Sequence, residues 1–404
     1  MRPGTNPSRP FNGRVLGAVC LALLASAPAL WLYLLPPQVL AALNRIADLN
    51  VHNSLLLHFE RREFERPNDD LRVIAIDERS LHLLGQFPWR RSLHAHLLRR
   101  LAAAGAKTVA FNVFFVDPAA DRSQDAQFAA ALNLVPTVLA YPLENAQRVP
   151  PIAATLSGHG AYLGFNSVDE PAGWLIGEWL TIGSPKKPLD SLQATALRLY
   201  TGKAFRREGT IEYFGARAIA LDARGHLLLL PVPVREAIDS DGLPFASVPF
   251  ARSMSYVDAL RANSANLRRF VAGKLVVIGP SAAGFDTMAS TPEGRILTFF
   301  ANLRIIDQLL TGRFIEPAPA WLDGLLIAGG ALLIALALTV FEPRAAVLAV
   351  VGILVGYALL DTVLYVTHYI LDDLIHVELA MVLAALVCTP FAIRSRRSAP
   401  EVRR

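Results

Sequence analysis

The pattern of apolar and polar positions divides the chain into long apolar segments near its ends and a region of mixed pattern between them. The first segment, at residues 15–35, is long enough to cross the hydrocarbon core of a bilayer, which takes about 20 residues. Similar segments follow at 321–341, 345–366 and 375–393. The pattern therefore predicts one N-terminal and three C-terminal transmembrane helices, with a folded domain at 36–320.

The first apolar segment is either a membrane anchor or a cleaved signal peptide. Ala25-Ser26-Ala27 has the small residues of a cleavage site. Pro28 directly follows that site and argues against cleavage. Trp31 and Tyr33 stand at the far end of the segment, where aromatic side chains favour the membrane interface. We therefore expect an uncleaved anchor.

The clearest pattern in the middle of the chain is a strand, a helix and a second strand. Residues 71–76 are a short apolar run rich in β-branched side chains, which is typical of a strand buried on both faces. Apolar residues then recur at helical spacing at 93–104, with Pro88 where the helix could begin and Gly105 where it could end. A strand at 107–111 follows, and a crossover of this length connects parallel strands.

The remaining pattern extends this arrangement. Further strands are predicted at 136–141 and 274–278, and further helices at 39–64, 78–84, 189–200, 299–310 and part of 256–270. Asp121 or Ser123 could cap a helix that precedes Phe128. Residues 222–225 read as a hairpin turn between strands, and 150–181 follow neither period. The hairpin strands would be 218–221 and 227–230. The sequence thus predicts an α/β domain with a mostly parallel sheet, joined to transmembrane helices.

Composition and charge support a membrane protein. Hydrophobic residues make up 53% of the chain and its mean hydropathy is +0.37, which is too apolar for an ordinary soluble enzyme. The formal net charge is +5, and the excess arginines lie in residues 1–14 and 394–404. Basic ends predict a cytoplasmic N-terminus and a basic cytoplasmic tail, so the domain lies outside. No aromatic residues interleave with these arginines, so nucleic acid is not an expected partner.

Cysteine placement adds one constraint. Cys20 and Cys388 both lie inside apolar segments. The domain between them contains no cysteine and therefore needs no disulfide, even in an oxidising compartment.

The first strand–helix–strand also carries a set of characteristic residues. These are Ile76, Asp77, Ser80, Leu81, Gly85, Pro88, Trp89, Arg91 and the turn at Ala104–Lys107. In type and spacing they resemble the opening of the CHASE type 2 domain, a sensory extracellular domain found in front of bacterial cyclases and histidine kinases. The strand at 274–278, the loop Gly279–Gly284 and Asp286 are similar to the end of that domain. The chain departs from the family at Asn112, usually Asp, and at Leu297–Asn302, usually a Gly-Val-Glu-x-His-Ala run.

The resemblance implies a membrane-anchored sensory protein of the bacterial inner membrane, with its large domain in the periplasm or outside the cell. We expect it to bind an unknown small-molecule or protein ligand there and to need no cofactor. Few residues follow Ile393, so we expect the signal to reach a separate cytoplasmic or membrane partner. The arginine-rich tail could dock that partner or anionic lipid.

The candidate ligand site lies at the carboxyl ends of the strands, where open α/β sheets bind ligands. Its candidate residues are Asp77, Ser80, Trp89, Arg90, Arg91, Asn112, Ser281 and Asp286. Asp77, Asn112 and Ser281 end three strands and should converge on one crevice. An arginine beside a tryptophan could clamp a small anion or a planar ligand. The loop Gly279–Gly284 could offer backbone N–H groups to an anion.

Each of these residues also has a structural interpretation. Asp77 could cap the helix at 78–84. Trp89 could belong to the core, and Arg90 or Arg91 could simply pair with Asp77 or Asp286. The alternatives for the whole protein are an envelope scaffold and a periplasmic enzyme using Asp77 and Asp286. We expect no enzyme, because the histidines of the domain show no metal-ligand spacing and read as structural.

Polar and small residues in the closing segments are further candidates. Asp361, His376 and Glu378 lie in or beside these segments, and charges within a membrane can mark an ion or proton pathway. We place all three near the outer interface, where they can reach water. Gly329-Gly330 would permit close helix packing, which favours a homodimer.

Overall fold

The computed structural model describes most of the chain in two compact units, Asn50–Ile315 and Met1–Leu49 with Glu316–Arg404. The described residues are 9–35, 67–143, 156, 161–166, 175, 177–184, 187–221, 225–230, 232, 234–238, 244–291, 294–368, 370–371 and 374–397. The helix predicted at 39–64 lies outside them.

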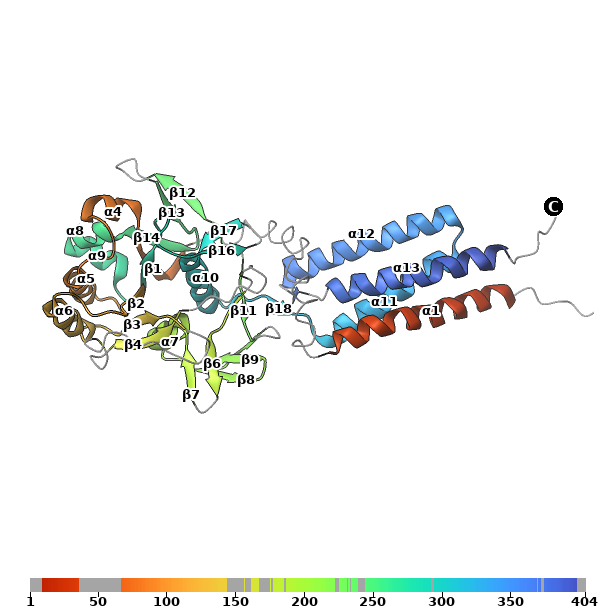
Figure 1. Ribbon diagram of the computed structural model, residues 1–404, viewed down its shortest axis with the longest axis horizontal. Helices are drawn as coiled ribbons and strands as arrows, with labels where there is room; N and C mark the ends of the chain where they lie inside the picture. Colours follow the sequence, from red (N-terminus) through yellow and green to blue (C-terminus); the bar gives the residue numbers. More distant parts are fainter. Residues whose placement is uncertain are drawn as a thin grey trace, which may run out of the picture. The chain divides into compact units, whose positions relative to one another are not determined.

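The first unit is built on a six-stranded sheet of order β14-β1-β15-β2-β3-β4, in which every neighbouring pair is parallel (Figure 1). Its strands are β1 (Asn68–Ile76), β2 (Thr108–Phe114), β3 (Thr137–Tyr141), β4 (Ala161–Phe165), β14 (Ala251–Ser255) and β15 (Leu275–Pro280). The predicted parallel sheet is therefore confirmed. β4 is a strand that the sequence pattern missed, inside the unassigned stretch 150–181.

Helices cover both faces of this sheet. Successive side chains of a strand point to opposite faces, so the apolar strands present a surface for packing on each side. The helices are α4 (Glu78–Leu84), α5 (Arg91–Ala103), α6 (Arg122–Leu132), α7 (Leu192–Thr201), α8 (Tyr256–Arg261), α9 (Ser264–Val271) and α10 (Thr298–Thr311). Ile74 and Ile76 of β1 belong to one core with α5, α6, α8 and α9. Leu71 and Val73 belong to the other core, with α7 and α10 (Figure 1).

Local interactions explain where these helices begin. Asp121 accepts a hydrogen bond from the Ser123 N–H and is the residue that caps α6. The predicted start of α5 near Pro88 is wrong, since the helix begins at Arg91. The Trp89 indole donates to the Gly85 carbonyl at 2.8 Å, which holds the segment between α4 and α5 out of the helix.

The predicted hairpin around 222–225 is also wrong. β10 (Arg217–Ala220) pairs with β9 (Ile211–Phe214), whereas β11 (Leu227–Leu228) pairs with β5 (Gly177–Glu178). Ile219 and Leu227 are both fully buried in one core, so burial and not the local turn selects their partners. The other short antiparallel strands are β6 (Thr181–Ser184) with β7 (Lys187–Asp190), β8 (Phe205–Glu208) with β9, β12 (Arg235–Ile238) with β13 (Pro244–Ser247), and β16 (Met288–Thr291) with β17 (Gly294–Leu297).

Within its described residues, the second unit contains four helices that are long and apolar enough to cross a membrane. These are α1 (Arg9–Tyr33), α11 (Ala320–Val340), α12 (Pro343–His368) and α13 (Leu374–Arg397), with a short parallel pair, β18 (Glu316–Pro317) and β19 (Ile370–Leu371). Apolar residues of α1, α11 and α13 share one core. The helices match the four predicted segments, and such a set fits a membrane protein.

Polar and small residues join these helices. The Tyr33 hydroxyl of α1 donates to Asp323 of α11 at 2.9 Å, and its ring meets the His376 ring of α13. A Cβ added to Gly330 would lie 2.7 Å from Met381, so this glycine allows α11 to approach α13 closely within one chain. Asp361 is buried and Glu378 exposed. The ion pathway and the homodimer stay predictions.

Candidate functional site: a buried polar chain at the carboxyl edge of the sheet

The carboxyl ends of three neighbouring strands meet at one edge of the sheet. β15 lies between β1 and β2, and all three run parallel. Asp77, Ser281 and Asn112 therefore stand at the same edge, and the crevice expected between them stays a prediction. The hydrogen bonds at this edge form two separate groups, one around Asp77 and one around Asn112.

Asp77 and Ser80 form the first group. One carboxylate oxygen of Asp77 accepts from the Ser80 N–H at 2.9 Å, from the Ser80 hydroxyl at 2.6 Å and from the Ser255 hydroxyl at 2.8 Å. The Ser80 hydroxyl in turn accepts from the Val257 N–H at 3.1 Å. Asp77 thus caps α4, as the structural interpretation proposed, and with Ser80 it fixes the start of α8.

Trp89, Arg90 and Arg91 lie at the start of α5. Trp89 is buried in the core, with its ring centroid 4.8 Å from that of Tyr256. Arg91 is also buried; it pairs with Asp125, donates to the Asp117 carbonyl and lies over the Phe115 ring. The expected pairing of Arg91 with Asp77 or Asp286 is therefore wrong, because α5 directs this side chain toward α6. Arg90 is exposed.

The backbone N–H groups of the loop after β15 donate hydrogen bonds to other residues of the domain. The N–H groups of Ser281 and Ala282 donate to the Ile76 carbonyl at 2.9 and 3.1 Å, and that of Ala283 donates to Glu78. Three donors that we assigned to an anion are thus already bound. The Ser281 hydroxyl is buried and has no hydrogen-bond partner among the described residues.

Asp286 caps the start of α10. Its carboxylate accepts from the Thr298 hydroxyl at 2.9 Å and from the Phe299 N–H at 2.7 Å. Burial raises the pKa of Asp286, although these hydrogen bonds oppose the shift. The residue therefore ties the loop after β15 to the helix that ends the domain.

The second group is a continuous chain of side-chain hydrogen bonds through the interior. Asn112 at the end of β2 accepts from Asn166, which directly follows β4. Asn166 accepts from Asn302 of α10 at 3.0 Å, and Asn302 accepts from Gln193 of α7. Gln193 also donates to Glu178 of β5 at 2.6 Å. We call Asn112, Asn166, Asn302, Gln193 and Glu178 the polar chain.

Two close approaches to the sheet position the helices that carry the polar chain. A Cβ on Gly164 of β4 would lie 2.5 Å from the Leu192 backbone, so the glycine lets the start of α7 reach the strand. A Cβ on Gly279 of β15 would lie 2.4 Å from the Phe299 ring, so α10 packs directly on that strand. Gln193 and Asn302 stand next to these contacts, one residue and one turn further along their helices.

The polar chain is buried except at Asn166, which is partly exposed, and it contains one ionisable group. Asn112, Glu178, Gln193 and Asn302 are all at most 6% exposed. Burial raises the pKa of Glu178 to about 8, and the nearby Asp286 carboxylate raises it further in the same direction. At neutral pH the Glu178 carboxyl is therefore mostly protonated and uncharged.

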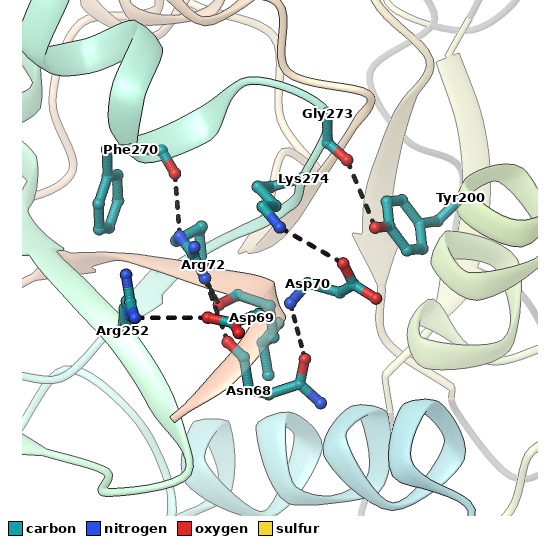
Figure 2. A network of polar contacts seen from close by, with 10 residues as sticks. Asn68, Asp69, Asp70, Arg72, Tyr200, Arg252, Phe270, Gly273 and Lys274 are labelled. Carbon is teal, nitrogen blue, oxygen red and sulfur yellow. Dashed lines mark hydrogen bonds and ion pairs between the residues drawn. The ribbon is translucent and has the colours of Figure 1, made fainter. Parts of the chain in front are cut away.

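A second polar network holds α10 at the opposite edge of the sheet, where the amino end of β1 lies. Arg72 of β1 donates to the Phe270 carbonyl at 2.9 Å and to the Asn68 carbonyl at 3.1 Å (Figure 2). The Asn68 side chain donates to Asp307 of α10 at 3.2 Å, and Asp307 pairs with the buried Arg304 at 3.0 Å. α10 is thus bound to both edges of the sheet by polar side chains.

One histidine, His94, is buried in the core that contains α5, α6, α8 and α9. Nδ1 of His94 lies 2.8 Å from the Tyr256 hydroxyl, and the ring is surrounded by aromatic side chains. Burial lowers the pKa of His94 to about 3, and the charge of Arg91 adds to the shift. Among the described residues, no three His, Cys, Asp or Glu side chains could hold a metal ion together.

Sequence reasoning found only part of the polar chain. It identified Asn112, and it identified Asp286, which acts on Glu178 through its charge. It missed Asn166 and Glu178, which lie in the stretch without a period, and it noted Asn302 only as a departure from the family run. Gln193 had a usable signal, since it is a polar residue among the buried positions of the predicted helix 189–200.

Comparison with known proteins gives one match. The family model for the CHASE2 domain matches residues 22–338 of the chain. No curated protein and no solved structure matched. The resemblance drawn from the sequence is therefore confirmed, and the match includes every residue of the polar chain.

Proposed function

This chain belongs to the CHASE2 family of sensory domains, and from this premise we propose that it is a membrane-anchored sensory protein of the bacterial inner membrane. The domain lies outside the cytoplasm and responds to a ligand or partner at the carboxyl edge of its sheet. The response shifts α10, which passes the change to the membrane helices and on to an output partner.

The observation that carries this proposal is the path of the polar chain. It begins at Asn112, at the edge of the sheet where α/β domains bind ligands, and it reaches Asn302 on α10. α10 ends at Thr311, and α11, the first of the closing membrane helices, begins at Ala320. A change at the sheet edge can therefore reach the membrane through one buried helix and a short connection.

We also propose that the domain is not an enzyme. Asp77 and Asp286, the acids of the enzyme alternative, both accept hydrogen bonds that hold helix starts. The scaffold alternative shares the fold but predicts no transmission to α11. Transmission along α10 therefore separates sensing from scaffolding.

The orientation is tested by cysteine labelling of the full-length protein in cells. Cys20 and Cys388 are replaced by alanine, and single cysteines are introduced as Ser264→Cys, on the exposed start of α9, and Arg404→Cys. A membrane-impermeant maleimide should label Ser264→Cys in intact cells, and Arg404→Cys only after permeabilisation. Labelling of Ser264→Cys only in permeabilised cells would end the proposal.

Transmission is tested by hydrogen exchange on the full-length protein in lipid nanodiscs. Asn302→Leu cuts the polar chain at α10, whereas Asn266→Leu changes an exposed residue of α9. We expect Asn302→Leu to change the protection of the first turn of α11, and Asn266→Leu to leave it unchanged. If Asn302→Leu alters α10 but leaves α11 as in the wild type, the domain is a scaffold and not a sensor.

A further inference from the structure

The end of the polar chain on β5 has two buried oxygen atoms that lack donors. Within the part of the chain that the structure describes, Oε1 of Glu178 and Oε1 of Gln193 have no hydrogen-bond partner. Both residues are 2% exposed. A buried polar atom without a partner is unfavourable, so a donor is required at this point.

The orientation of the Gln193 amide is fixed by its own bonds. Its Nε2 donates both hydrogen atoms, one to Oε2 of Glu178 and one to the Asn302 side-chain oxygen. An amide rotated by itself would place its oxygen against these two acceptors, because Asn302 donates its own N–H to Asn166 and so presents its oxygen to Gln193. The unpaired oxygen of Gln193 is therefore a true acceptor, and it belongs to the amide already bonded to Glu178.

A single proton can satisfy both atoms. A carboxylic acid and a primary amide form two complementary hydrogen bonds, one from N–H to the acid carbonyl and one from the acid O–H to the amide carbonyl. The geometry points to the proton as a ligand of this domain, held on Oε1 of Glu178 and donated to Oε1 of Gln193. This inference rests on the proposed sensory function and names its stimulus as external pH.

The charged surroundings of Glu178 favour the bound proton. Asp286, in the loop after β15, adds negative charge, whereas Gln193 of α7, which donates to Glu178, and Asn302 of α10, which accepts from Gln193, are both uncharged. His226, which directly precedes β11, is a second titratable side chain beside β5, with its ring 4.8 Å from that of Trp179. Burial and Asp286 hold the pKa of Glu178 at about 8, within reach of ordinary changes in external pH.

Loss of the proton from Glu178 weakens the contacts that hold α10, because it acts on Gln193 and Asp286. The proton leaves to solvent, and Glu178 becomes a carboxylate that can no longer donate to Gln193. Gln193 is bonded to Asn302, and Asp286, whose charge now opposes that of Glu178, caps α10 at Phe299. Both contacts are in the first two turns of α10, so ionisation loosens the helix from the carboxyl edge of the sheet.

The test uses the full-length protein in nanodiscs and the variant Glu178→Gln. Glutamine has the shape of the neutral acid and can both accept from and donate to Gln193, but it binds no proton. Infrared difference spectra should show a protonated carboxyl group that titrates with a midpoint of about pH 8 and is absent in Glu178→Gln. Exchange of α10, corrected for the intrinsic pH dependence of amide exchange, should change over the same range in the wild type only.

The control is Glu208→Gln, which removes a half-exposed carboxylate on β8 and should leave both signals as in the wild type. The inference is overturned if no buried carboxyl group titrates near this pH, or if α10 still responds to pH in Glu178→Gln. A carboxyl group that titrates without any change in α10 or α11 also overturns external pH as the stimulus. Failure of the inference leaves the effect of Asn302→Leu on α11 intact, so it is distinguishable from failure of the proposed sensory function.

Discussion

Phe299 of α10 lies directly on Gly279 of β15, so closely that an added Cβ would come within 2.4 Å of the ring. Real Cβ atoms do not approach ring atoms to that distance. The contact places the first turn of α10 on the carboxyl end of the sheet, beside Asp286, which caps the helix. Because Gly279 has no side chain, α10 can pack closely on the sheet, and this brings Asn302 to its place in the polar chain.

Gly279→Ala should destabilise the domain by about 1–3 kcal/mol, because the methyl group must displace the fully buried Phe299 ring. Phe299→Leu should also destabilise, but the double variant should be more stable than the sum of the two single effects predicts, since the smaller side chain makes room. Thermal unfolding of the full-length protein measures all three. Additive losses would show that the two residues are not coupled.

Stability should depend on pH through two buried groups whose pKa values are shifted in opposite directions. The pKa of His94 is lowered from 6.5 to about 3, so the unfolded state binds the extra proton and stability rises with pH in that window. The pKa of Glu178 is raised from 4.5 to about 8, so the folded state binds the extra proton and stability falls with pH in that window. The two slopes oppose each other where the windows overlap.

Glu178→Gln isolates the second slope. Above the ordinary pKa of histidine, its stability relative to the wild type should increase by up to about 1.4 kcal/mol per pH unit and level off above pH 8. Glu212, a buried acid that does not act on Glu178, titrates in both proteins and cancels in the difference. A constant difference between the two proteins across this range would show that Glu178 ionises normally.

The sequence predicted the frame of the molecule because the frame depends on local pattern. Residues 71–76 and 274–278 could be identified as strands because they are apolar on both faces, and the four candidate membrane segments because they are long and strongly apolar. The pairing of the short strands was harder to predict from the sequence. Residues 222–225 favour a turn, but the strands on either side of it take partners from 177–178 and 211–214, and only tertiary burial selects these.

The site was less predictable than the fold for the same reason. A polar residue near the end of a strand, such as Asn112, can be placed at the sheet edge from the strand pattern alone. Glu178 and Asn166 come from a stretch without periodicity, and nothing in their neighbours shows that they are buried. Arg91 was expected at the site because it stands beside Trp89, yet its partner Asp125 lies a helix away.

Asp77→Ala tests whether the first group at the sheet edge is structural. Removing the carboxylate should destabilise the domain by about 1–3 kcal/mol, because the cap of α4 and two serine hydroxyls lose their acceptor. The pH response of α10 should be unchanged, since the hydrogen bonds of Asp77 among the described residues go to Ser80 and Ser255 and not to the polar chain. Loss of that response in a folded Asp77→Ala protein would join the two groups into one site.

Arg91 and Asp125 should behave as a buried ion pair, in which loss of one partner destabilises the domain more than loss of both. Arg91→Met or Asp125→Leu alone leaves one buried charge without its partner and should cost about 3–5 kcal/mol. The double variant replaces both charges with apolar side chains and should recover most of that loss. Arg206→Ala, which breaks the largely exposed pair with Glu208, should change stability by less than about 1 kcal/mol. Thermal unfolding of the four variants measures the coupling, and a double variant as unstable as the sum of its parts would assign Arg91 a role beyond the pairing with Asp125.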